Sequence, residues 1–243
     1  MDAARRTAAV TGALFLVTEV AAIAGLALYR PALDGAAYVA GSGPDARVLA
    51  GALSEMVLIV AVIGTGVALY PTIRRRHEAL AVGYVCGRLL EAAVIAVGIV
   101  SLLAVVSLRQ DLAQGSPATD TGAFEAAATA LAAVHDWTFL LGPNVFLGAN
   151  TLVLAYVMLR TGLVPRPIAL LGLAGGTLIC ASAVAVLFGL YAQLSAVGTL
   201  AALPVFAWEV TLAVRLLTRG FEPARPVRAG TPEGPVRAGS PGA

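Results

Sequence analysis

Charged side chains interrupt the long apolar stretches of this sequence at a few isolated positions. They are Glu19, Glu55, Arg88, Glu91 and Glu209. A charge near the centre of a lipid bilayer costs about 2.5–3.5 kcal/mol, even on the most lenient scale. We therefore expect these residues either to carry chemistry or to hold helices together through polar contacts.

Arg88 and Glu91 are three residues apart, so they lie on one helix face and can pair. Gly83 and Gly87 precede Glu91 at four-residue steps, which predicts a smooth stripe where another helix approaches the carboxylate closely. One arginine cannot neutralise four carboxylates. We therefore expect some of the glutamates to be protonated at neutral pH, and a protonated acid in an apolar cavity can donate its proton to a ligand.

Three of the glutamates each fall near the middle of their own apolar stretch, so they share a depth in the bilayer. The residues predicted to be catalytic are these three and the arginine, namely Glu55, Arg88, Glu91 and Glu209. Exposure of any of them to lipid would be costly. The sequence therefore predicts that they converge on one internal cavity.

A second group of polar residues surrounds the start of the fourth apolar stretch. His135 beside Asp136 offers an acid/base pair or a pH sensor, Trp137 suits the membrane interface, and Pro143 should break the helix locally. The residues predicted to bind a ligand are Glu19, His135, Asp136, Asn144, Asn150 and Trp208. No histidine lies near His135 and no Cys/His ligand spacing occurs, so we expect neither a metal site nor a cofactor.

A structural role is the alternative for each of these residues. Glu55 and Glu209 could be hydrogen-bond partners between helices, and Arg88 with Glu91 could be a buried ion pair that fixes their register. The two asparagines of the fourth stretch could serve the same purpose. For a single residue the two interpretations are about equally good, but five intramembrane charges together favour a function.

The composition is that of a membrane protein. Of 243 residues, 59% are hydrophobic and 12% are charged, whereas about 25% are charged in a soluble domain. Apolar stretches near or above the ~20 residues that cross a bilayer occur at residues 8–29, 47–70, 79–107, 137–160, 167–190 and 197–218. We therefore predict an all-α, polytopic bundle of about six transmembrane helices within residues 1–220. The lipid bilayer is its expected surrounding, and its scattered basic residues argue against nucleic-acid binding.

The arginines predict how the bundle is oriented. All 16 basic residues are arginine, a bias typical of high-GC bacterial genomes. If the N-terminus is inside, twelve arginines fall on the inner side and only Arg30, Arg47 and Arg109 on the outer side. The positive-inside rule then predicts both termini in the cytoplasm, with the chain in the bacterial cytoplasmic membrane.

Two segments are expected outside the bundle. An Ala-rich run after Gly115-Ser116-Pro117 predicts a short amphipathic helix at residues 120–134, lying along the outer face of the membrane. Residues 221–243 are rich in Pro, Gly and Arg and contain the repeat Pro-Val-Arg-Ala-Gly. Such a segment has little to bury, which predicts a disordered cytoplasmic tail.

Several short motifs together resemble a known family. They are Glu55, Gly64-Thr65-Gly66 leading to Tyr70-Pro71, Arg88-Leu89-Leu90-Glu91, the run from His135-Asp136-Trp137 to Gly142-Pro143, Gly162-Leu163-Val164-Pro165-Arg166, and Trp208-Glu209. From about Arg5 to Phe221 the chain resembles the bacterial membrane-protein family called domain of unknown function 4386. The resemblance implies a six-helix membrane fold. It implies no activity and no catalytic residues.

Three functions fit these residues. The first is a membrane enzyme or binding protein whose buried Glu/Arg cluster binds or protonates a small lipid-like molecule of isoprenoid type. The second is a proton-coupled permease, for which six helices are few, so that a homodimer would be expected. The third is a structural or regulatory accessory without turnover. We favour the first, with a small lipophilic ligand as partner; whether the chain is an enzyme is left open by the sequence.

Overall fold

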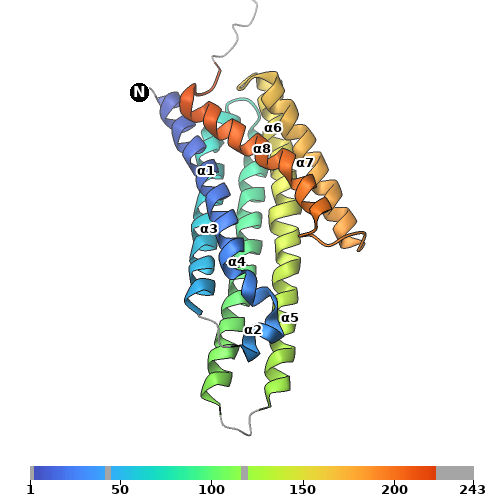
Figure 1. Cartoon of the computed structure of the whole chain (residues 1–243). Coiled ribbons are helices and arrows are strands. Elements are labelled where there is room, and N and C mark those ends of the chain that lie inside the picture. Colours follow the sequence, from blue (N-terminus) through green and yellow to red (C-terminus); the bar gives the residue numbers. More distant parts are fainter. Residues whose placement is uncertain (1–2, 42–44, 116–119, 223–243) are drawn as a thin grey trace, which may run out of the picture.

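A computed structural model describes residues 3–41, 45–115 and 120–222 of the chain. Helices make up the fold in this part of the chain (Figure 1). In order they are α1 (Ala3–Tyr29), the 3-10 helix η1 (Arg30–Leu33), α2 (Gly35–Ala40), α3 (Asp45–Arg74), α4 (Glu78–Gln114), α5 (Thr121–Leu140), the π-helix η2 (Leu141–Phe146), α6 (Leu147–Thr161), α7 (Arg166–Leu187) and α8 (Ala196–Thr218).

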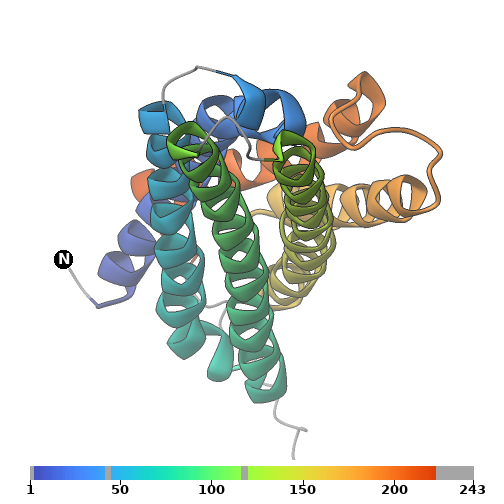
Figure 2. The ribbon, with the colours of Figure 1, turned by 90° about the horizontal axis from the view of Figure 1, so that it is seen from below.

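The predicted six-span, all-α bundle is confirmed. Within the described residues, six helical stretches are long and apolar enough to cross a membrane: 3–33, 45–74, 78–114, 121–161, 166–187 and 196–218. The fourth consists of α5, η2 and α6 in direct succession. α7 and α8 are tilted against α3, α4 and α5, as both views show (Figures 1 and 2).

The start of α1 and the end of α8 lie together at one end of the bundle (Figure 1). The guanidinium of Arg5 donates hydrogen bonds to the carbonyl oxygens of Leu216 (2.8 Å) and Leu217 (2.6 Å) in the last turn of α8. At the same end, Arg76 donates to the carbonyl of Thr161 at the end of α6 (2.9 Å). Arginine thus caps the helix ends on the face that the sequence predicts to be cytoplasmic.

The predicted surface helix is wrong in its placement. Residues 121–134 are helical, but they form the first part of α5, which continues through η2 into α6 instead of ending at the membrane surface. α4 and α5 pack side by side and project beyond the other helices (Figure 1). Because α4 is roughly 55 Å long and the bilayer core about 30 Å thick, this hairpin is longer than a span requires.

A small polar cluster holds the short helix α2 against the hairpin. The carboxylate of Asp45, at the start of α3, accepts hydrogen bonds from the Tyr38 hydroxyl (2.7 Å), Arg109 (2.7 Å) and Gln110 (3.1 Å). The guanidinium of Arg109 lies 4.8 Å from the centre of the Tyr38 ring, within the range of a cation–π contact. α2 could not be predicted from the sequence, because six residues are too few to show a periodic pattern.

Close packing of α7 against α6 and α8 depends on glycine residues. A side chain at Gly172 of α7 would collide with the indole of Trp208 on α8, and one at Gly176 would meet the backbone of Gly148 on α6. Gly172 and Gly176 therefore allow α7 to pack closely against α8 and α6. Trp208 is fully buried and stands edge-on to Phe15 of α1, with ring centres 6.2 Å apart.

The predicted tail falls almost wholly outside the described residues. Its first residues are in place: the backbone N–H of Glu222 donates to the carbonyl of Leu163 (2.8 Å), and its carboxylate pairs with Arg215. Residues 223–243, with both copies of the repeat, are not among the residues that the structure describes, so the disorder of the tail stays a prediction.

The orientation of the bundle can be tested with reporter fusions. Tags at the N-terminus and after Phe221 should both report the cytoplasm, because the arginine-rich helix ends gather on that face. A tag inserted near Gly115, at the tip of the hairpin, should report the outer side. Termini on opposite sides of the membrane, or a cytoplasmic Gly115, would contradict the orientation.

Candidate functional site

The site is built around the buried guanidinium of Arg88 in the first third of α4. Its Nη1 donates to both oxygens of Glu91 (3.1 and 2.9 Å), one helical turn further on, and its Nε donates to the hydroxyl of Tyr84 (3.2 Å). Its Nη2 lies 3.6 Å from Oε1 of Glu209 on α8. The guanidinium carbon is 5.6 Å from the ring centres of both Phe15 and Tyr84. Two carboxyl groups and two aromatic side chains therefore surround one charge.

Glu91 is held from two sides. Besides the ion pair with Arg88, its Oε2 accepts a hydrogen bond from the side-chain amide of Asn150 on α6 (2.8 Å). Asn150 reaches this carboxylate because α4 has no side chain at Gly87, where a Cβ would collide with the Asn150 amide oxygen. At Gly83 no atom lies within 4 Å of such a Cβ, so the predicted glycine stripe makes a close contact at only one of its two positions.

Next to this ion pair lies a cavity of about 230 Å³. Its walls come from α1, α3, α4, α5, η2, α6 and α8 and are mostly apolar, with Leu58, Val62 and Phe206 among them. Glu19, Arg88, Glu91, Asn144 and Glu209 are its charged and amide-bearing lining residues. We call this space the inner cavity.

Two carboxyl groups face each other in the inner cavity. Glu19 of α1, which is half-buried, interacts with Glu209 of α8, which is only 5% exposed. The Oε1 atom of Glu209 has no hydrogen-bond partner among the described residues. Two facing carboxyl groups can hold one proton between them, and the pair can then both donate and accept a proton.

Glu55 does not join this cluster, contrary to the predicted convergence. It is buried on α3 and lines a separate cavity of about 10 Å³, together with His135 and Thr138 of α5. Ile95, Phe139 and Pro143 line both cavities and stand between the two polar groups. Ile95 lies one helical turn beyond Glu91 on α4 and separates the Arg88 cluster from Glu55. A similar depth in the membrane therefore did not bring Glu55 and Arg88 together.

The surroundings of Glu55 form a second polar cluster. The Tyr29 hydroxyl faces the Glu55 carboxylate without reaching hydrogen-bond geometry, and the Tyr29 ring stands edge-on to His135, with centres 4.9 Å apart. His135 is 3% exposed, and its Nδ1 lies 3.8 Å from the carboxylate of the exposed Asp136. A carboxylate, an imidazole and a phenol thus meet in an apolar part of the bundle.

The remaining predicted ligand-binding residues differ in placement. Asn144 lines the inner cavity, whereas Asn150 is used to hold Glu91. Trp208 is part of the core against Phe15 and lines none of the cavities described here. The predicted break at Pro143 is present as the π-helix η2, since a proline cannot donate the hydrogen bond that an α-helix requires there.

Sequence reasoning missed two aromatic contributors. Tyr84 and Phe15 flank the guanidinium of Arg88, and Tyr84 precedes it by four residues on α4. The four-residue spacing is a signal that could have identified Tyr84. Phe15 lies on another helix, and nothing in the local sequence distinguishes it from other core residues.

The family comparison covers most of the chain. The sequence model of the family described as Domain of unknown function (DUF4386) matches residues 10–220. The chain belongs to this family. The polar residues of the inner cavity and of the Glu55 cluster all fall within the DUF4386 region. No curated protein and no solved structure matches the chain, so the assignment brings no activity with it.

The contact between Gly87 and Asn150 in this DUF4386 protein can be tested with a matched pair of substitutions. Gly87→Ala should lower the free energy of unfolding by roughly 1–3 kcal/mol, because the new Cβ displaces the Asn150 amide and leaves Glu91 with an unmade buried hydrogen bond. Gly83→Ala should stay within about 1 kcal/mol of the wild type, because its Cβ meets open space. Equilibrium unfolding in detergent micelles measures both, and equal effects would contradict the assignment of the contact.

Proposed function

We propose that the chain is a multi-pass protein of the bacterial cytoplasmic membrane that binds a small lipophilic molecule in the inner cavity. The observation that carries the proposal is an apolar chamber in which one acid, Glu209, has an oxygen without a hydrogen-bond partner, 3.6 Å from the fixed guanidinium of Arg88. Binding pockets for small molecules are largely apolar and contain a few polar groups that orient the ligand. With a volume of about 230 Å³, the chamber suits a ligand near the small end of that class.

The acids of the site have different tasks in this proposal. Glu91 is used to hold Arg88, because both of its oxygens accept from the guanidinium and one of them from Asn150 as well. Glu19 and Glu209 remain for the ligand. A hydroxyl, carbonyl or epoxide oxygen placed against them can accept their shared proton in a hydrogen bond.

Protonation of the ligand is the further step that this arrangement supports. The one proton shared by Glu19 and Glu209 would move to the ligand oxygen and leave two carboxylates, of which that of Glu209 is stabilised by Arg88 at 3.6 Å and both by the positive charge gained by the ligand. The pair regains a proton when the rearranged ligand loses one to it before leaving. This step makes a proton-dependent isomerisation or cyclisation of an isoprenoid-like molecule the class of reaction to examine.

A proton-coupled permease is the second candidate, and one observation favours it. Ionisable groups occupy two levels of the bundle, with Glu55 and His135 on the far side of Phe139 from the inner cavity. Transporters place such groups along the route of a substrate or proton. Proton-driven uptake of a radiolabelled terpene alcohol into proteoliposomes would support this candidate over a binding protein or enzyme.

Filling the inner cavity tests ligand binding directly. Ala202→Phe places a ring into the cavity from α8 and should exclude geraniol, a small isoprenoid alcohol, from the inner cavity, so that the protein in nanodiscs binds one molecule fewer than the wild type. Ala207→Phe, on the exposed face of the same helix, is the matched control and should bind as the wild type does. Native mass spectrometry and titration calorimetry both read out the complex.

The role of Glu209 is tested in the same assay. Glu209→Gln should weaken geraniol binding about tenfold, since the loss of one strong hydrogen bond is worth about 1.4 kcal/mol. The variant should keep its fold, because Arg88 retains Glu91. Saturable binding that survives Ala202→Phe unchanged would overturn the proposed site, whatever the effect of Glu209→Gln.

A further inference from the structure

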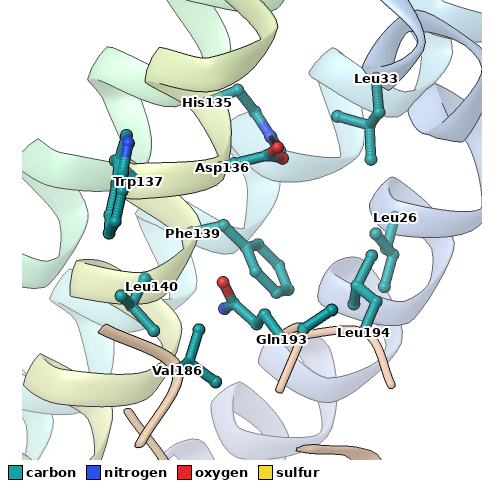
Figure 3. A pocket seen from close by; sticks show the side chains of 11 residues that line it. Leu26, Leu33, His135, Asp136, Trp137, Phe139, Leu140, Val186, Gln193 and Leu194 are labelled. Carbon is teal, nitrogen blue, oxygen red and sulfur yellow. Dashed lines mark ion pairs between the residues drawn. The ribbon is translucent and has the colours of Figure 1, made fainter. Parts of the chain in front are cut away.

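A second pocket lies away from the Arg-capped end of the bundle. It has a volume of about 310 Å³ and is enclosed by the end of α1, η1, α5, the end of α7 and the connection to α8. Most of its wall is apolar, with Leu26, Leu140, Val186 and Leu194 among the lining residues (Figure 3). We call it the outer pocket.

Two polar atoms in the wall of the outer pocket are buried without a hydrogen-bond partner in the described residues. One is Nε2 of Gln193, in the connection between α7 and α8, and the other is Nδ1 of His135. Figure 3 shows the Gln193 amide reaching toward α5 next to the ring of Phe139. An amide N–H shielded from water and left unpaired is unfavourable, and a ligand with an acceptor oxygen would relieve this.

The positions of these atoms define the ligand that the pocket would take. The Gln193 amide nitrogen can only donate, so the matching group is a hydroxyl or carbonyl oxygen. Because the rest of the wall is apolar, the rest of the ligand should be a hydrocarbon chain. A cationic amine would find a carboxylate at Asp136, but it would leave the Gln193 donor unpaired, because an ammonium group accepts no hydrogen bond.

The outer pocket is separate from the inner cavity. Phe139 lines both, and its ring stacks on His135 with centres 6.2 Å apart and an angle of 21° between the planes. The two aromatic rings therefore form a partition between the outer pocket and the acids of the inner cavity. A ligand in the outer pocket contacts Gln193 and His135. The partition separates it from Glu19 and Glu209, the residues assigned to proton transfer above.

We propose that the outer pocket is a second binding site, selective for neutral amphiphiles that carry one hydroxyl or carbonyl group. Gln193 donates the hydrogen bond that holds this group, and the leucines of α1 and of the α7–α8 connection enclose the hydrocarbon chain. The site is independent of ligand binding in the inner cavity, because no residue of the Arg88 cluster lines it.

Photoaffinity labelling tests the site with the full chain in nanodiscs. The probe is an aliphatic alcohol with a diazirine on its chain, and a diazirine hydrocarbon of the same length is the comparison. We expect the alcohol to label residues 135–140 and 186–194 and an excess of geraniol to compete with it. The hydrocarbon should label these segments only at the level of lipid-facing helix surfaces.

Two variants assign the effect to Gln193. Gln193→Leu and the isosteric Gln193→Glu both remove the amide donor and should lower labelling of the outer pocket by about three- to tenfold at subsaturating probe. Gln114→Leu, which makes the same change at an exposed position at the end of α4, should label as the wild type does. A melting curve for each variant confirms that it is folded.

The results separate this inference from the proposed function. Labelling of 135–140 and 186–194 that geraniol does not compete, or that is equal for alcohol and hydrocarbon, would overturn the outer pocket as a site. Labelling that both Gln193 variants leave unchanged would overturn it as well. Labels on inner-cavity residues such as Val205 and Phe206 report on the other site and should be insensitive to Gln193→Leu.

Discussion

A guanidinium in the middle of an apolar bundle sets the strongest constraint on this structure. Arg88 is 3% exposed, and a charge taken out of water is tolerated only if its hydrogen-bonding groups and its charge are matched. Its partners come from different helices: Glu91 from its own, Glu209 from α8, and the Phe15 ring from α1. Satisfying one side chain therefore fixes the relative positions of α1, α4 and α8, and the cavity beside it follows from that arrangement.

The same constraint separates the acids into two kinds. Glu91 is fully engaged by Arg88 and Asn150, so the structural interpretation describes it well. Glu209 contributes charge through its Oε1, 3.6 Å from Nη2 of Arg88, but this oxygen has no hydrogen-bond partner within the described part of the chain, and Glu19 faces Glu209 across the inner cavity. The structural and functional interpretations are thus both needed, and they apply to different residues of one cluster. An ion pair that holds Arg88 in place also supplies the fixed positive charge that a proton donor in its vicinity requires.

The sequence predicted those features that depend on local pattern. Six spans follow from apolar length, the Arg88–Glu91 pair from a three-residue spacing, and the disturbed helix at Pro143 from the chemistry of proline. Features that depend on tertiary packing could not be predicted from the sequence. Depth along a span says nothing about the direction in which a side chain points, so Glu55 was grouped with Arg88 although it faces His135. The extension of α4 and α5 was missed because an alanine-rich helix looks the same on a membrane surface and in a projecting hairpin.

The π-helix η2 explains how one span can serve two polar clusters. A π-turn holds an extra residue, so the helix face that follows it is rotated by roughly a quarter turn relative to an uninterrupted α-helix. Before η2, His135 points to Glu55 and Tyr29; after it, Asn150 points to Glu91 on α4. Within this stretch Pro143 and Asn144 are neighbours in sequence, and both line the inner cavity. The proline therefore does more than interrupt a helix: it sets the register that lets one helix complete the Arg88 cluster while its other half forms the wall that separates this cluster from the outer pocket.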